Sequence, residues 1–467
     1  MRGNKNFISN IIKVLISNVS TIVAGIIIGF IIPKVISVEG FGYYKTFTLY
    51  ASYAGLFSLG IIDGIVLDYG GCDYEDYDKE LFRSIFRWYV LIHLVWAALL
   101  IAVSFFFKDS NYSYIVIMIA VYMMLSNFVG FFQQISQITQ RFKEYSLIKI
   151  TQSAMRVASG LIMVAIFLIS KNLVSYKIYV CLSVLEFLFV SAGYFHIYKE
   201  IIKGRCHSLA STRKTVIHLS TIGFPLLFAN LSSTLILNID RQFVNILFSN
   251  TEYAVYAFAY NLLALVTVAT SAVATVLYPM LKRTTKDTLK KNYSNLIGTM
   301  LMLVFGIIII YFPLCWFITW FLPNYTESLI IFRIIFPGLA ISSAITVIMH
   351  NYYKTLGDNM LFFVRSLIVL GISAAANYAA YSMFHTTVSI SMASIISILI
   401  WYVYAEQYFV KNYQYSRWGN LLYIFLMMGA FYMITIIDNL LLSGLLYAAA
   451  FIIITVVLQK PLKTMLK

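Results

Sequence analysis

The chain alternates long apolar stretches with short polar connections from one end to the other. A run of about 20 apolar residues is long enough to cross a hydrocarbon core of about 30 Å as a helix. Fourteen such runs occur, and each predicts one membrane-spanning helix. The predicted spans are 10–32, 46–66, 88–107, 114–132, 147–169, 176–196, 219–239, 254–278, 295–313, 328–350, 361–381, 387–406, 420–437 and 441–458.

The composition indicates an all-α polytopic membrane protein. Hydrophobic residues make up 61% of the chain and charged residues 11%, with a mean hydropathy of +0.83, whereas a soluble domain carries about 25% charged residues. The net charge of +15 would suggest nucleic acid as a partner in a soluble protein. In a membrane protein it follows from Lys and Arg in loops retained in the cytoplasm, so no nucleic acid is expected.

The positions of these basic residues predict the orientation. With the N-terminus inside, cytoplasmic loops and tails hold 23 of the 34 Lys and Arg residues, and the opposite loops hold four. Short loops rich in Lys and Arg stay in the cytoplasm. Both termini are therefore expected to be cytoplasmic.

A weak internal repeat suggests how the helices are grouped. "VEGFGYYKTF" (38–47) follows the first predicted span and "TEYAVYAFAY" (251–260) follows the seventh, with Glu39 matching Glu252 and Tyr43 matching Tyr256. Two units of six helices would be parallel repeats, because six is even. The predicted parts are a lobe at 1–218, a lobe at 219–406, and two further helices with a cytoplasmic tail at 407–467.

Two stretches resemble a known family. "VEGFGYY" after the first span and "IGFPLLFANLSSTLILNIDRQFVNILFSNTEYAVYAFAYNL" (222–262) are similar to the bacterial polysaccharide repeat-unit flippases (O-antigen and capsule, Wzx-type) of the multidrug/oligosaccharidyl-lipid/polysaccharide exporter superfamily. The arrangement of six, six and two spans resembles that family too. "LGIIDGIVLDYGG" (59–71) departs from it, because Asp63 and Asp68 stand where neutral or basic residues are expected.

The resemblance implies a flippase that moves a polyprenyl-pyrophosphate-linked oligosaccharide across the bacterial cytoplasmic membrane by alternating access. Its partners would be that lipid-linked oligosaccharide, membrane lipids and other polysaccharide-assembly proteins. One alternative is a cation-coupled multidrug exporter of the same superfamily, which needs buried carboxylates more than buried bases. A lipid II flippase is a third hypothesis, disfavoured because the first span carries only Lys13. A scaffold that transports nothing is a fourth.

Motifs of enzymes are absent from the sequence. There is no Walker A lysine loop, no HExxH and no clustered pair of Asp residues. Cys72, Cys181, Cys206 and Cys315 are scattered and support neither a disulfide framework nor a zinc site. We therefore expect no enzyme, cofactor or metal, and transport driven by an ion gradient, the membrane potential or the substrate gradient.

Arg156 is the base nearest to mid-membrane. It shares one face of the fifth predicted helix with Lys149, Gln152 and Ser159. Two bases on a polar stripe favour a water-filled cavity in which Arg156 and Lys149 bind a pyrophosphate. The competing interpretation is a structural ion pair, since Glu186 of the next helix lies at a similar depth, about 15 Å against about 13.5 Å.

A second polar stripe precedes the Asp240–Arg241 pair. Asn230, Thr234, Asn238 and Arg241 fall within 80° on a continuous helix, and Asp240 lies off that stripe. Because Arg241 is about 33 Å from residue 219 along the helix axis, we expect it at the outer mouth of a cavity. Simple snorkelling of Arg241 to the interface explains the same position equally well.

The remaining candidates are weaker. Arg333 and Arg365 fit snorkelling anchors better than substrate ligands, and Pro337 with Gly338 could bend the tenth helix. Asp63 faces either the cavity or the inner headgroups. The segment Phe131–Ser146 predicts a solvated amphipathic helix, with an inner gate as the second interpretation. The candidate substrate-binding residues are Arg156, Lys149, Gln152, Arg241, Asn238, Arg333 and Arg365, and the ion-coupling candidates are Glu186, Asp63 and Asp240.

Overall fold

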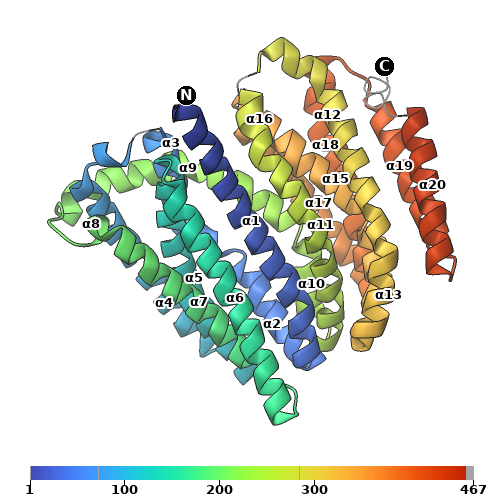
Figure 1. Ribbon diagram of the computed structural model, residues 1–467, viewed down its shortest axis with the longest axis horizontal. Coiled ribbons are helices and arrows are strands. Elements are labelled where there is room, and N and C mark those ends of the chain that lie inside the picture. Colours follow the sequence, from blue (N-terminus) through green and yellow to red (C-terminus); the bar gives the residue numbers. More distant parts are fainter. Residues whose placement is uncertain (1, 72, 283, 459–467) are drawn as a thin grey trace. The chain divides into compact units, whose positions relative to one another are not determined.

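The computed structural model describes residues 2–71, 73–282 and 284–458, and within these ranges every regular element is a helix (Figure 1). Cys72, Arg283 and the tail 459–467 lie outside the described residues. Each of the fourteen predicted runs overlaps a helix or a bent pair of helices. Among the described residues, ten helices are long and apolar enough to span a membrane, or up to twelve if each bent pair is one span. The predicted multi-pass, all-helical fold is confirmed.

The chain divides into two compact units, Met1–Leu231 and Ser232–Lys467. Helix α9 (Leu209–Ile236) begins in the first unit and ends in the second. The other α-helices of the first unit are α1 (Arg2–Val35), α2 (Val38–Ala51), α3 (Ile61–Tyr69), α4 (Lys79–Ser104), α5 (Ser110–Ile138), α6 (Phe142–Ser170), α7 (Tyr176–Ile197) and α8 (Lys199–Ile202).

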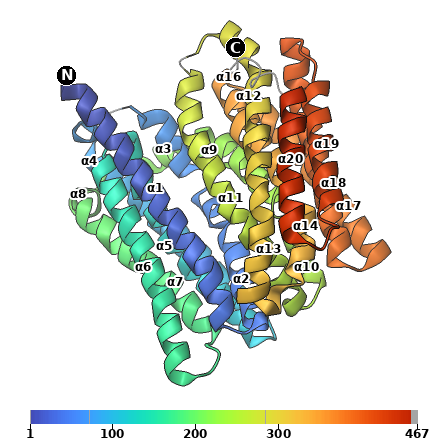
Figure 2. The ribbon, with the colours of Figure 1, turned by 45° about the vertical axis from the view of Figure 1, so that its right-hand side comes forward.

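The second unit is also entirely helical over its described residues. It contains α10 (Ile239–Leu247), α11 (Asn250–Lys282), α12 (Lys286–Ile307), α13 (Tyr311–Phe321), α14 (Ser328–Ile335), α15 (Gly338–Ser343), α16 (His350–Leu356), α17 (Asn359–Phe384), α18 (Thr387–Tyr413), α19 (Trp418–Ile434) and α20 (Leu440–Leu458). Figure 2 shows α19 and α20 as an adjacent pair. The chain from α12 to the end of α13 is one span, so the ninth helix extends beyond its predicted end at 313.

Two spans are bent, and local sequence explains both bends. The second predicted span turns by 53° between residue 58 and α3, where Leu59 and Gly60 adopt left-handed backbone angles, φ 51° and 77°. The tenth turns by 47° at Pro337, just before Gly338. Proline removes a helical hydrogen bond and crowds the preceding turn. The predicted bend at this position is confirmed.

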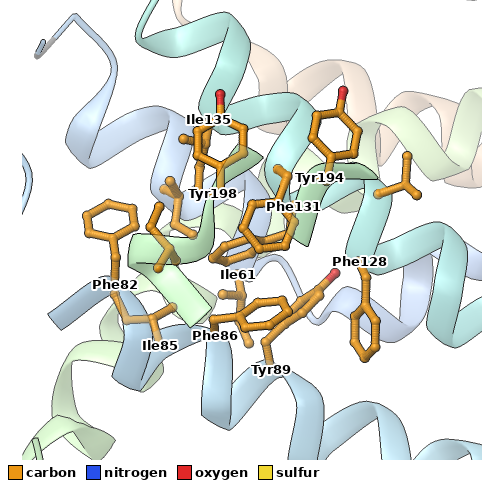
Figure 3. Close-up of a cluster of buried hydrophobic side chains, with 14 of the residues drawn as sticks. Ile61, Phe82, Ile85, Phe86, Tyr89, Phe128, Phe131, Ile135, Tyr194 and Tyr198 are labelled. Carbon is orange, nitrogen blue, oxygen red and sulfur yellow. The ribbon is translucent and has the colours of Figure 1, made fainter. Parts of the chain in front are cut away.

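The core of the first unit is an aromatic cluster contributed mainly by α3, α4, α5 and α7 (Figure 3). Phe82 and Ile85 of α4 pack there with Phe131 and Ile135 of α5, each at most 1% exposed. The prediction of a solvated amphipathic helix over Phe131–Ser146 is therefore wrong. Instead α5 continues to Ile138 and α6 starts at Phe142, with the apolar face of α5 inside the cluster.

Candidate functional site

Arg156 and Glu186 form an ion pair within the first unit. The guanidinium of Arg156 on α6 donates to the carboxylate of Glu186 on α7, through Nη2 to Oε1 at 3.0 Å and Nε to Oε2 at 3.5 Å. Gln152, one turn earlier on α6, is a further partner of that carboxylate. Only 3% of the Glu186 side chain is exposed, against 31% for Arg156. The acid is buried, and the base keeps part of its surface open.

Tyrosines enclose this pair. Tyr44 of α2 packs edge-on against Tyr179 of α7 with ring centroids 5.0 Å apart, and both interact electrostatically with Arg156 and Glu186. Tyr122 of α5 is close enough to interact with the same two charges. Aromatic rings from α2, α5 and α7 thus lie close to the pair.

Lys149 lies on the same helix but has different partners. Its Nζ donates to Asn18 Oδ1 of α1 at 2.7 Å and to the Tyr145 hydroxyl at 3.0 Å. Farther along α6, Ser153 is 3.1 Å from Thr21 of α1. The predicted polar stripe is thus divided: Lys149 is bonded towards α1, whereas Gln152 and Arg156 are bonded towards α7. Beside it, α1 and α6 form an apolar groove of about 510 Å³ that includes Val19, Val23, Ile150 and Val157.

The Asp240–Arg241 pair lies at a break between helices. The chain leaves α9 after Ile236 and resumes as α10 at Ile239, with Leu237 and Asn238 in a turn. The assumption of one continuous helix from 219 to 241 is therefore wrong, and the second polar stripe does not run unbroken to Arg241. Sequence periodicity cannot detect this break, because no Gly or Pro occurs in 236–239.

Asp240 and Arg241 bond to different groups rather than to each other's side chains. The Asp240 carboxylate accepts from the hydroxyls of Tyr256, at 2.7 Å, and Tyr260, and from the Arg241 backbone N–H. The Arg241 guanidinium stacks on the Tyr260 ring at 4.3 Å and donates to Leu237 O and Asn238 Oδ1. Its bond to Leu237 O gives a partner to a backbone oxygen at the break.

This cluster borders a cavity of about 220 Å³ within the second unit. Asp240, Arg241, Tyr260 and Ser342 supply its polar atoms, and the rest of its lining is apolar. Arg241 is therefore among the residues that line this cavity, and its predicted place at the outer mouth of a transport cavity stays a prediction.

The other candidates are dispersed. Arg365 donates to Tyr404 O at 2.7 Å and lies over the rings of Tyr404 and Tyr408, so it joins α17 to α18. Arg333 is partly buried on α14. Asp63 is partly buried on α3 near Tyr89.

The sequence reasoning overlooked Glu406. It is fully buried near the end of α18, and its Oε1 accepts from the Tyr402 hydroxyl at 3.0 Å and from the Tyr415 hydroxyl. A single acid in an apolar run with Tyr four residues earlier was the available signal, because residues at i and i+4 face each other on a helix.

Comparisons with known proteins identify the fold. A family model described as "Polysaccharide biosynthesis protein" matches residues 7–285. No curated protein matches the chain. Among solved structures, the chain is similar to "Lipid II flippase MurJ, inward closed conformation", with 15% identity, a TM-score of 0.69, and coverage of 97% of this chain and 99% of that one.

Multidrug transporters share the same architecture. An inward-facing "multidrug resistance MATE family transporter of the MOP superfamily" has 11% identity and a TM-score of 0.56, over 85% of this chain and 95% of that one. The Vibrio cholerae MATE transporter VcmN has 13% identity and a TM-score of 0.56, over 87% and 96%. At such identities the likeness shows the fold. The matched family and these neighbours are transporters, which confirms the prediction that the chain is not an enzyme.

Proposed function

The chain belongs to the polysaccharide biosynthesis protein family, and from this premise we propose that it is a flippase for a polyprenyl-pyrophosphate-linked oligosaccharide. It would carry the repeat unit across the bacterial cytoplasmic membrane for surface polysaccharide assembly. The family match over residues 7–285 carries the proposal. The MurJ-like fold supports it, because that neighbour is named as a lipid II flippase.

We further propose a fourteen-helix topology with both termini in the cytoplasm. The lobes at 1–218 and 219–406, and the final pair of helices at 407–467, remain part of this proposal. Lys and Arg counts support the orientation. The membrane itself, membrane lipids and other polysaccharide-assembly proteins would be the partners.

Arg156 is the proposed contact for the pyrophosphate. Glu186 engages two of its nitrogen atoms, and 31% of the side chain is exposed. A guanidinium presents five N–H donors in a planar fork, so one that is held by a buried acid is already oriented for a phosphate. Because Glu186 balances the charge of Arg156, the net positive charge on α6 near this site comes from Lys149, which is bonded to Asn18 of α1. Secondary contacts with the substrate are proposed for Gln152, Arg241, Asn238, Arg333 and Arg365.

A cation-coupled exporter is the second candidate, and buried carboxylates favour it. Glu186 is 3% exposed and Asp240 2% exposed. Asp63 completes the set of proposed coupling residues. An exporter that exchanges cations for drugs needs such acids, whereas a flippase of an anionic lipid needs bases.

The test is complementation of a bacterial strain that lacks its own repeat-unit flippase. Surface polysaccharide is measured and normalised to membrane-inserted protein. The wild-type chain should restore export, Arg156→Lys should lower it severalfold, and Arg156→Gln should abolish it, because Lys offers a point charge in place of a planar fork. Lys171→Gln, in an exposed connection, is the matched control and should export normally.

Two results would contradict the proposal in different ways. Wild-type export by the Arg156→Gln protein would remove Arg156 from the site and transfer its role to Arg333 and Arg365. Absence of export by the wild-type chain, together with cation-dependent drug efflux from the same cells, would favour the exporter.

A further inference from the structure

The connection after α7 is fastened to the start of α4 at several points. Arg83 donates to the carbonyl oxygens of Glu200, at 2.7 Å, and Arg205. The backbone N–H of His207 donates to Ser84 Oγ at 2.8 Å, and Trp88 Nε1 donates to Leu209 O at 3.1 Å. A polar loop joining two six-helix repeats would be the obvious flexible linker. These bonds instead make the segment part of the first unit.

The part of α9 just before Pro225 packs still more closely against α3. A Cβ added at Gly60 would meet Phe224 N at 2.7 Å, one added at Gly64 would collide with Leu219 O, and one added at Gly223 would collide with Gly60 O. Three glycines thus allow the two backbones to touch. Small residues four apart permit such close packing of helices in a membrane. Figures 1 and 2 show α3 beside the first part of α9.

Polar contacts reinforce this crossing on both sides. Ser220 Oγ donates to Leu59 O at 2.5 Å, and His218 Nε2 lies 3.0 Å from Asp68 Oδ2. Directly after the crossing comes Pro225, inside α9. Proline lacks the N–H that would bond to the carbonyl oxygen four residues earlier. The helix is thus weakened where its contacts with α3 end, and it is interrupted again at Leu237 and Asn238.

We propose that residues 199–224 move as part of the first unit throughout the transport cycle, and that the joint between the units lies in α9 between Pro225 and Asn238. The grouping of Met1–Leu231 as one compact unit agrees with this placement. The α3–α9 crossing is then a permanent attachment and does not open as a gate. This inference rests on alternating access in the proposed function, and it places the moving boundary inside a spanning helix rather than in the loop at 197–218.

A cross-link between Asp68 and His218 tests the attachment. The two side chains are 35% and 58% exposed, so thiol reagents can reach them. Cys72, Cys181, Cys206 and Cys315 are first replaced by Ser. Asp68→Cys with His218→Cys is then bridged by a short bifunctional thiol reagent, and export is compared with that of the unbridged protein. The two single-cysteine proteins, treated with the same reagent, control for its chemical effect.

No loss of export on bridging is the expected result. Loss of export in the bridged protein, with normal export by both treated single variants, would overturn the proposal, because the contact would have to open in each cycle. Spin labels at the same two positions provide a readout that needs no transport substrate. A reference pair of spin labels at Glu75 and Asp287, one in each unit, identifies the conditions that change the conformation. In each of those conditions we expect a single narrow distance between the labels at 68 and 218. Two distances between 68 and 218 would overturn the proposal even if the flippase assignment failed.

Discussion

Removal of the Arg156 side chain should destabilise the first unit, because it leaves the buried Glu186 carboxylate without its base. Only 3% of Glu186 is exposed, and its nearest contact with Arg156 is 3.0 Å. Two unit charges at that distance attract by about 5 kcal/mol at an effective dielectric constant of about 20. Loss of one partner of a buried pair costs about 3 to 5 kcal/mol. The two magnitudes agree.

The expected outcome is a much smaller folded fraction. A loss of about 3 kcal/mol lowers the ratio of folded to unfolded protein more than about a hundredfold. The assay is size-exclusion chromatography of detergent-solubilised protein after graded heating, which gives the fraction that stays monodisperse. Arg156→Ala should shift the midpoint down strongly. Adding Glu186→Gln should recover part of the loss, because an amide carries no charge and can still bond to Gln152. Arg213→Ala removes an exposed charge and should change nothing.

Two outcomes would refute this reasoning. An Arg156→Ala protein with the wild-type midpoint would show that the pair does not hold α6 to α7. A double variant no more stable than Arg156→Ala would show that the damage does not come from an unpaired acid. The same variants separate stability from transport: if Arg156 also serves the substrate, the double variant regains folded protein but exports nothing.

Three further outcomes are expected. A cysteine at Leu209 should be protected from an impermeant external thiol reagent while one at Asp438 is labelled, and the reverse pattern would contradict the orientation. Gly64→Ala should reduce folded protein because its Cβ collides with α9, whereas Gly25→Ala, with nothing within 4 Å of the added Cβ, should be tolerated; equal stability of the two would refute the close crossing. The Asp78 carboxylate caps the start of α4 by accepting from the backbone N–H groups of Glu80 and Leu81, and the bond from Leu81 is the main cause that holds the pKa of Asp78 below its usual range. The cap therefore stabilises the fold above about pH 4, and this stabilisation is lost as the pH falls through the lowered pKa. Asp78→Ala should therefore lower the thermal midpoint at neutral pH and cease to matter in acid.

Apolar periodicity predicted the helices well, because a spanning helix must satisfy its backbone internally and display about 20 apolar residues. The bend at Pro337 was also predictable, because a proline removes a hydrogen bond within its own helix. The sequence also suggested the Arg156–Glu186 contact, since adjacent antiparallel helices bring residues of equal depth together. In each of these cases the relevant information lies within one helix or one helical hairpin.

Contacts between distant segments left no comparable signal. The three-glycine crossing of α3 and α9 joins residues about 160 positions apart, and a GxxxG spacing at Gly60 and Gly64 does not name its partner. No Gly or Pro marks the break at Leu237, and the bond from the Arg241 guanidinium to Leu237 O forms only in the folded chain. The solvated helix predicted at Phe131–Ser146 failed because aromatic residues from α4 and α7 cover α5 there. In all three cases, contacts between distant segments of the chain determined the local structure.

Glu406 shows what such packing implies for a single side chain. It is fully buried, and the hydroxyls of Tyr402 on α18 and Tyr415 in the connection to α19 both donate to its Oε1. Removal of the acceptor leaves the buried Tyr402 hydroxyl and the partly buried Tyr415 hydroxyl without this partner. An unsatisfied buried donor costs about 1 to 3 kcal/mol, and the connection loses a contact that holds it to α18. Glu406→Leu should therefore lower the thermal midpoint of the protein, whereas Glu406→Gln keeps an acceptor oxygen and should stay close to wild type. Glu75→Leu, at an exposed position in a short 3-10 helix, controls for loss of an acidic residue. If Glu406→Gln proves as unstable as Glu406→Leu, the carboxyl group itself is required at this position, and hydrogen bonding to the two tyrosines does not explain why a glutamate is buried there.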